Sequence, residues 1–317
     1  MAKRKLILDV DTGTDDAVAV MLAALHPALD LVACTTVNGN VEVAHGTDNT
    51  LRVLDHIGRR DVPVYEGLAR PLVRPDFPVP RTVDDRAGKF HGKTLPLPPT
   101  ARAKAAQGAV EFLIETYRQA TDEITLVPVA PLTNIAAALT LDPKLTERVP
   151  EVVIMGGGHA IGNVTPSAEF NIWADPEAAA IVFGAGFRKI TLVPLDATHR
   201  ALVSRADCDR LRGLGTPAGE AAAECIGHRI VAHDAAQQMA TPGTTPVHDA
   251  VCVAYLVEPP VIATRKLHVA VETAGALTVG RTVIDTQFRG SGLPQCDVAF
   301  DSDPARFVDL LVRTFAA

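Results

Sequence analysis

The sequence predicts an α/β protein with an open, mostly parallel, Rossmann-like sheet and helices on both of its faces. Short runs rich in Val, Ile and Leu alternate with longer Ala-rich segments, the pattern of buried parallel strands joined by crossover helices. Polar residues follow nearly every predicted strand, and ligands of doubly wound sheets bind beyond the carboxyl ends of the strands. The chain has 317 residues and 47% hydrophobic content, and no linker composition divides it, so we expect one domain over residues 1–317.

The predicted elements follow from local patterns. We expect strands at 6–10, 31–36, 124–127, 152–155 and 190–195, where β-branched and aliphatic residues cluster. We expect helices at 15–25, 46–56, 105–119, 134–141 and 176–183. Thr133 is expected to cap one of them, and Asp175 another, with Pro176 at the first helical position.

Two long stretches resist assignment to regular elements. Residues 73–99 carry prolines that forbid a regular helix, and residues 213–247 end in TPGTTPVHDA. Loops of this length in a compact protein are commonly functional lids. We therefore expect two lid-like loops, at about 73–99 and 213–247.

Composition excludes several classes of function. The formal net charge is −7, which argues against a basic nucleic-acid-binding surface. No apolar run is long enough to span a membrane, and no apolar stretch of signal-peptide type follows the basic residues at the start. The five cysteines are scattered without a C-x-x-C pair, so we expect buried, reduced thiols and a cytoplasmic protein.

An acidic cluster follows the first predicted strand, in the segment DVDTGTDDAV at 9–18. Asp15 and Asp16 begin a helix, where carboxylates suit the positive end of the helix dipole. Asp9 and Asp11 lie two apart, on the same face of a strand, where they repel each other. A hard divalent cation such as calcium would relieve that repulsion.

A second interpretation of this cluster is a magnesium-dependent phosphatase of the haloacid dehalogenase type. Asp9 would be its nucleophile and Asp11 its acid, two residues apart. That signature continues with a hydroxyl-bearing or β-branched residue, and Gly13 stands there. The phosphatase is therefore kept as the alternative enzyme.

Motifs along nearly the whole chain resemble those of the inosine-uridine-preferring nucleoside hydrolases. DVDTGTDDA is similar to the family signature D-x-D-P-G-x-D-D, with Thr12 in place of Pro. Further matches occur in the family's order: TTVNGN at 35–40, LVPVAPLTNIA at 126–136, MGGG at 155–158, GNVTPSAEFNIWADPEAA at 162–179, VHDAVCVAY at 247–255 and LTVGRTVID at 277–285.

This resemblance implies hydrolysis of the N-glycosidic bond of ribonucleosides to ribose and free base, with one bound Ca²⁺. It implies that Asp11, Asp16 and Asp249 bind the ion through carboxylates, and Val129 through its main-chain carbonyl. Asp11 would take a proton from a calcium-bound water as general base. The surrounding carboxylates would stabilise the positive charge that develops on the ribose ring.

The remaining site residues are also carried over from the resemblance. His248 is expected beside the leaving base as its proton donor, while Asp9 and Asp15 support the site by hydrogen bonds. Contacts with the substrate are expected from Asn40, Asn163, Glu169 and Asn171 to the ribose hydroxyls and from His91 to the base.

The resemblance does not decide the base preference. No aromatic pair in the two predicted lids forms a stacking slot for purines, and Trp173 is the only Trp. The presence of both His91 and His248 favours uridine, inosine or cytidine. The family resemblance also implies a homo-oligomer, a dimer or tetramer. A calcium-dependent ribose-binding protein without catalysis is the non-enzymatic alternative.

Overall fold

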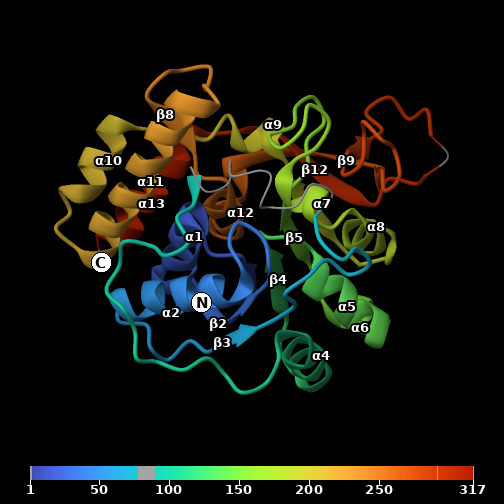
Figure 1. Cartoon of the computed structure of the whole chain (residues 1–317), viewed down its shortest axis with the longest axis horizontal. Helices are drawn as coiled ribbons and strands as arrows, with labels where there is room; N and C mark the ends of the chain where they lie inside the picture. The colour runs from blue at the N-terminus through green and yellow to red at the C-terminus, as the bar shows by residue number, and fades with distance from the viewer. Residues whose placement is uncertain (1, 78–89, 291, 317) are drawn as a thin grey trace.

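A computed structural model of the chain describes residues 2–77, 90–290 and 292–316. An eight-stranded sheet forms its centre, in the order β3-β2-β1-β4-β5-β6-β12-β9. Neighbouring strands are parallel, except that β9 runs antiparallel to β12 at one edge. Helices cover both faces of this sheet, with α1, α2 and α12 on one side and α4, α5 and α8 on the other (Figure 1). The predicted α/β fold is confirmed.

The five predicted strands are present, with ends that differ by no more than two residues from those expected. The strand expected at 190–195 stops at Val193, because Leu195 already begins a short helix. The sheet consists of β1 (Arg4–Val10), β2 (Leu29–Thr36), β3 (Val64–Glu66), β4 (Ile124–Pro128), β5 (Val152–Met155), β6 (Ile190–Val193), β9 (Ile262–Leu267) and β12 (Cys296–Ser302). Two small sheets pair β7 (Leu202–Ser204) with β8 (Thr244–Pro246) and β10 (Val269–Val271) with β11 (Thr282–Ile284).

The five predicted helices are also present, although two of them begin more than one residue from the expected start. The helix expected from 105 begins at Ala109, after Gly108, and the one expected from 46 begins at Val43. The helices are α1 (Thr14–Leu25), α2 (Val43–His56), α4 (Ala109–Gln119), α5 (Thr133–Leu141), α6 (Leu145–Arg148), α7 (Phe170–Ala174), α8 (Pro176–Gly184), α9 (Leu195–Thr198), α10 (Arg205–Arg212), α11 (Pro217–Ala236), α12 (His248–Val257) and α13 (Pro304–Phe315), with a 3₁₀ turn at Pro259–Val261.

One of the two expected helix caps is confirmed. Asp175 accepts a hydrogen bond from the Ala178 N–H at 3.1 Å and caps α8. Thr133 does not cap α5, because Leu132 occupies the cap position. The Thr133 hydroxyl instead donates to Asp175 Oδ2 at 2.7 Å, which links the starts of the two helices.

The prediction of an irregular segment over 213–247 is wrong for most of its length. Residues Pro217–Ala236 form the 20-residue helix α11. Thr216 accepts from the Gly219 N–H at 3.1 Å and Pro217 takes the first helical position, so the start is capped in the usual way. The many alanines favour a helix by intrinsic propensity without producing a strong amphipathic pattern. Of the other expected lid, residues 78–89 lie outside the described part of the chain.

Strand β1 is central and directs the chain to the carboxyl edge of the sheet. Leu6, Leu8 and Val10 pack in the core on one face, and Ile7 packs in the core on the other. All four are fully buried, since strands and helices flank β1 on both sides. Asp11, Asp15 and Asp16 follow Val10, the last residue of β1, and therefore emerge where β1, β2, β4 and β5 end.

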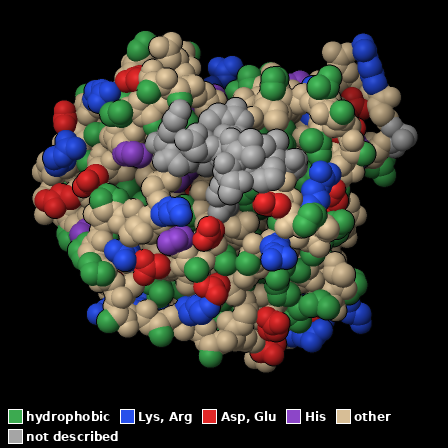
Figure 2. Space-filling view, in the orientation of Figure 1, with side chains coloured by type: hydrophobic (Ala, Val, Ile, Leu, Met, Phe, Trp, Pro, Cys, Tyr) green, Lys and Arg blue, Asp and Glu red, His purple; other side chains and the backbone are tan. Residues whose placement is uncertain are grey.

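The surface shows no single sign of charge on the face drawn in Figure 2. Among the described residues there, Lys and Arg are interspersed with Asp and Glu. No helix in the described ranges has the length and apolar character to cross a membrane.

Candidate active site

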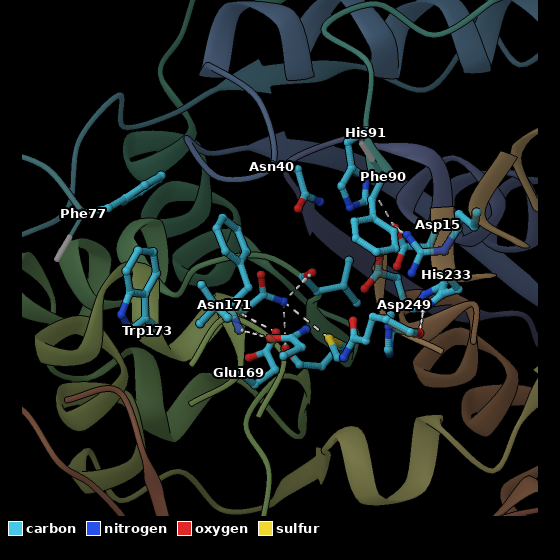
Figure 3. A pocket seen from close by; sticks show the side chains of 18 residues that line it. Asp15, Asn40, Phe77, Phe90, His91, Glu169, Asn171, Trp173, His233 and Asp249 are labelled. Atoms are coloured by element: carbon cyan, nitrogen blue, oxygen red, sulfur yellow. Dashed lines mark hydrogen bonds and ion pairs between the residues drawn. The ribbon is translucent and has the colours of Figure 1, made fainter. Parts of the chain in front are cut away.

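A pocket lies at the carboxyl edge of the sheet, between the loops after β1, β4 and β5 and the helices α11 and α12 (Figure 3). Nine of the twelve expected site residues line it: Asp15, Asn40, His91, Val129, Asn163, Glu169, Asn171, His248 and Asp249. The other three, Asp9, Asp11 and Asp16, are fully buried beside or beneath it. Residues that are far apart in the sequence are thus brought together as expected.

Asp11 and Asp16 both contact Asn40, which lines the pocket. Asn40 donates to Asp11 through its backbone N–H, at 2.5 Å, and through Nδ2, at 3.0 Å. Its Nδ2 also lies 3.2 Å from Asp16 Oδ2, which accepts from the Gly13 N–H as well. A Cβ atom at Gly39 would lie 1.9 Å from Asp11 Oδ2, so only glycine lets this loop close on the carboxylate.

A cluster of carboxylates that could hold a metal ion is present. Oxygens of Asp15, Asp16 and Asp249 all lie within 4.8 Å of one another, and all three residues are buried. Burial raises the pKa of Asp16 to about 6, and burial with the neighbouring carboxylates raises the pKa of Asp11 and Asp249 well above its ordinary value. A divalent cation would remove the cost of keeping these groups ionised side by side.

Asp15 differs from its acidic neighbours because it has a cationic partner. Arg229 of α11 lies 2.9 Å from Asp15 Oδ1, and both side chains are almost completely buried. Arg229 also donates to the Pro246 carbonyl at 3.1 Å and to Thr14 Oγ1 at 3.3 Å. The charge of Asp15 is therefore balanced within the protein, whereas no such partner contacts Asp16 or Asp249 among the described residues.

The His91 ring lies against the start of α1. Its Nδ1 accepts a hydrogen bond from the Thr14 N–H at 3.3 Å and lies 3.8 Å from Asp15 Oδ1. Burial lowers the pKa of His91 to about 4, an effect larger than the opposing pull of Asp15. The imidazole is therefore neutral near pH 7, and since Nδ1 accepts, the proton is on Nε2.

The carbonyl of Val129 is held in place by Asn171. Asn171 Nδ2 lies 3.0 Å from the Val129 oxygen and 3.2 Å from the Met155 oxygen, so it ties together the loops after β4 and β5. Glu169 caps α7 by accepting from the N–H groups of Asn171 and Ile172, and it also accepts from Gly157 at 2.7 Å. Burial raises the pKa of Glu169 to about 7.

Asn163 is positioned by the same short helix. Its Oδ1 accepts from the Phe170 N–H at 2.9 Å, which orients the side chain at the pocket wall. Phe170 lies edge-on to Phe77, and Trp173 packs against both rings. An aromatic wall therefore closes the end of the pocket away from Asp15 and Asp249 (Figure 3).

Asp9 is not exposed to the pocket. One carboxylate oxygen accepts from Thr35 Oγ1 at 2.5 Å and from Asn134 Nδ2 at 2.9 Å, and the side chain is 0% exposed. Burial raises its pKa to about 7. A side chain so enclosed links the end of β2 to the start of α5, and it is not accessible as the nucleophile that a phosphatase would need.

His248 is the first residue of α12 and directly precedes Asp249. Its Nδ1 lies 2.7 Å from the hydroxyl oxygen of Thr198, and its ring centroid is 5.6 Å from that of His199. Burial, followed by the positive charge of Arg229, lowers the pKa of His248 well below its ordinary value. The resting side chain is therefore neutral.

The contribution of α11 to the pocket was not predicted from the sequence. Arg229 and His233 line the pocket four residues apart, on one face of the helix near its C-terminal end, and Gln237 lines it directly after the helix. Phe90 faces His233 edge-on, with 4.8 Å between the ring centroids. The signal was available in the Thr216-Pro217 helix start and in the spacing of four.

Comparisons with known proteins agree with this geometry. The family model described as inosine-uridine preferring nucleoside hydrolase matches residues 6–309. A relative from Shewanella sp. (strain MR-7), named pyrimidine-specific ribonucleoside hydrolase RihA, is 39% identical over 99% of this chain and 96% of its own length. A protein of the same name from Citrobacter koseri is 37% identical over 98% of this chain and 97% of its own length.

Solved structures give the same result. The purine-preferring ribonucleoside hydrolase from Gardnerella vaginalis superposes with a TM-score of 0.90 at 31% identity, covering 99% of this chain and 98% of its own. Together with the sequence relatives, this match overturns the alternative interpretation of the chain as a phosphatase. This chain belongs to the inosine-uridine preferring nucleoside hydrolase family and is a ribonucleoside hydrolase.

Proposed function

We propose that this enzyme hydrolyses pyrimidine ribonucleosides to ribose and free base with the help of a bound Ca²⁺. The pyrimidine preference is supported by relatives at 37–39% identity that are named pyrimidine-specific. The purine-preferring structural neighbour is less similar in sequence, at 31% identity. The observation that supports this reaction is a pocket with buried carboxylates in and beside its lining and neutral histidines at its side.

The cation ligands that we propose are Asp11, Asp16, Asp249 and the carbonyl oxygen of Val129. Asp15 is the less suitable ligand, although it lies within the cluster, because Arg229 already balances its charge. Asp11 accepts one hydrogen bond from Asn40 on each carboxylate oxygen, which leaves a lone pair on each oxygen for the ion. An all-oxygen donor set with several carboxylates suits a hard cation such as Ca²⁺.

The ion would supply charge neutralisation, oxygen coordination for the ribose hydroxyls and acidification of a water molecule. Asp11 accepts the proton of the attacking water, as general base. The ionised carboxylates stabilise positive charge on the ribose ring as the bond to the base breaks. Burial raises the pKa values of these carboxylates and so favours their protonated form. A bound cation would keep them ionised, and the site would need it for this reason.

The other expected residues are proposed to bind the ribose, to assist the base or to support the site. Asn40, Asn163, Glu169 and Asn171 are proposed to bind the ribose hydroxyls, and buried polar groups of this kind reject a sugar that lacks a hydroxyl. His248 and His91 are proposed to assist the departing base, and the neutral His248 would do so as a hydrogen-bond donor instead of the proton donor expected from the resemblance. Asp9 and Asp15 are proposed to support the site from behind.

Cellular setting and assembly are also proposals. All five cysteines are buried free thiols, which fits a reducing compartment, and we propose that the enzyme acts in the cytoplasm. We expect a homo-oligomer, a dimer or tetramer, from the family resemblance. Sedimentation of the purified chain tests this expectation.

A substrate panel tests the proposed reaction. Uridine, cytidine, inosine, adenosine, 2′-deoxyuridine and uridine monophosphate are incubated with the enzyme, after prolonged chelation and after adding Ca²⁺ or Mg²⁺. We expect Ca²⁺-dependent release of uracil or cytosine that exceeds purine release, and little release from deoxyuridine. Faster purine release would overturn the pyrimidine preference, and activity that survives chelation would overturn the metal requirement. Binding of uridine without base release would favour the ribose-binding alternative.

A further inference from the structure

Thr198 lies behind His248, on the short helix α9, and does not line the pocket. It is 0% exposed, and its Oγ1 lies 2.7 Å from His248 Nδ1. Two arrangements satisfy this distance. Either the hydroxyl donates to an unprotonated Nδ1, or a protonated Nδ1 donates to the hydroxyl oxygen.

The surroundings of Thr198 decide between them. A hydroxyl has one proton to donate, and a buried proton without an acceptor is unfavourable. In the described part of the chain, His248 Nδ1 is the hydrogen-bond partner of the Thr198 hydroxyl. The carbonyl four residues earlier, at Pro194, already accepts from the N–H groups of Ala197 and Thr198. The hydroxyl therefore donates to Nδ1.

We propose that Thr198 is a positioning residue that holds His248 in the tautomer with its proton on Nε2, so that Nε2–H is presented to the leaving base as a hydrogen-bond donor. His248 lines the pocket while Nδ1 is engaged by Thr198, so Nε2 is the nitrogen left to face a ligand. This inference rests on the proposed function, since it requires a nucleoside in the pocket.

The role follows from how electrons move in the reaction. When the bond between C1′ and the base nitrogen breaks, the electron pair goes to the base, and water supplies the new C1′–O bond. The water's proton goes to Asp11, and one proton overall ends on the base. A neutral Nε2–H donor stabilises the negative charge that builds on the base. Because Nδ1 accepts the Thr198 proton, the imidazole keeps one proton, on Nε2, which is the neutral donor this role requires.

The experiment compares two substrates that differ in their need for help at the leaving group. The uracil of uridine is a poor leaving group, whereas p-nitrophenyl riboside releases a stable phenolate without assistance. Thr198→Val keeps the shape of the side chain and removes the hydroxyl. We expect kcat for uridine to fall at least about tenfold, part of the roughly 10²–10³-fold cost of losing a donor to a developing negative charge, and kcat for p-nitrophenyl riboside to stay unchanged.

Two further variants serve as controls. Thr198→Ser restores the hydroxyl and is expected to recover most of the uridine activity. Thr314→Val removes the hydroxyl of another buried threonine, whose Oγ1 has no hydrogen-bond partner in the described structure, and is expected to change neither rate. Equal losses on both substrates with Thr198→Val, or no loss on either, would overturn the proposal.

The tautomer can also be observed directly, without turnover. Proton–nitrogen correlation spectra of the imidazole side chains distinguish a protonated Nε2 from a protonated Nδ1, and His248→Asn identifies the His248 signal. We expect the Nε2–H pattern in the wild type and a mixture in Thr198→Val. A wild type with the Nδ1–H pattern would overturn the proposal even if nucleosides are hydrolysed, whereas a wild type inactive on both substrates would refute the proposed function itself.

Discussion

Replacing Arg229 with methionine removes the cation that balances Asp15 in the acidic site. The pair is separated by 2.9 Å and both side chains are buried, with 3% and 6% exposure. Removing one partner of a buried ion pair costs about 3–5 kcal/mol, because the remaining charge stays buried without compensation. Asp16 and Asp249 lie within 4.8 Å of Asp15 in this cluster, so repulsion adds to that cost.

The expected change in melting temperature follows from the size of the protein. Unfolding entropy is about 2.1 cal/mol/K per residue. Over 317 residues this amounts to roughly 0.7 kcal/mol/K, and the predicted loss lowers Tm by about 4–8 °C. Thermal unfolding followed by circular dichroism, in the presence of a chelator, measures the change directly.

A matched control distinguishes the cost of breaking a buried ion pair from the cost of breaking an exposed one. Arg212 and Asp209 also lie 2.9 Å apart, but their side chains are 56% and 76% exposed. Arg212→Met should cost below about 1 kcal/mol, since solvent screens exposed pairs. Adding Asp15→Asn to Arg229→Met should recover part of the lost Tm. If Arg229→Met were no more destabilising than Arg212→Met, the argument from buried charge would be refuted.

Three further predictions concern the cation and the water. Asp11→Asn should lower kcat by about 10²–10⁴ on both uridine and p-nitrophenyl riboside, because both reactions need the base; a loss on uridine alone would contradict this role. Asp249→Asn should abolish the rise of Tm on adding Ca²⁺, while Tm in chelator should not fall, since one buried charge is removed; a preserved Ca²⁺ effect would exclude Asp249 as a ligand. Burial raises the pKa of Asp9 to about 7 and of Asp16 to about 6, so their contribution to the stability of the chelated protein is present below about pH 4 and is lost as pH rises to about 7. Because Ca²⁺ binds ionised carboxylates, the rise in Tm that it causes should be larger at pH 7.5 than at pH 5. The test measures Tm with and without Ca²⁺ at both pH values. The histidine contributions cancel in the difference between the two Tm values at each pH.

Much of the fold could be predicted because its signals are local. A run of β-branched and aliphatic residues identifies a strand buried on both faces, and Asp175-Pro176 identifies a helix start, without reference to the rest of the chain. β3 has three residues and β9 is mostly exposed, so neither has a distinctive pattern. Helix α11 was missed because small residues spread around it obscure its buried face.

The sequence by itself determined that an acidic motif would emerge at the carboxyl end of the first strand, since the apolar run Leu6-Ile7-Leu8 directly precedes Asp9. Tertiary structure decided what each acid does. Asp9 and Asp11 lie two residues apart, yet Asp9 is enclosed by Thr35 and Asn134, and Asp11 contacts Asn40, which lines the pocket.

Contacts between residues far apart in the chain could also not be predicted from the sequence, because folding brings those residues together. Arg229 reaches Asp15 across 214 residues, and Thr198 reaches His248 across 50. A carboxylate's charge state and an imidazole's tautomer depend on burial and on these contacts, and neither is encoded in neighbouring residues. The sequence therefore determines which chemical groups are present at the sheet edge, and the packing of α9, α11 and α12 decides their charge and direction.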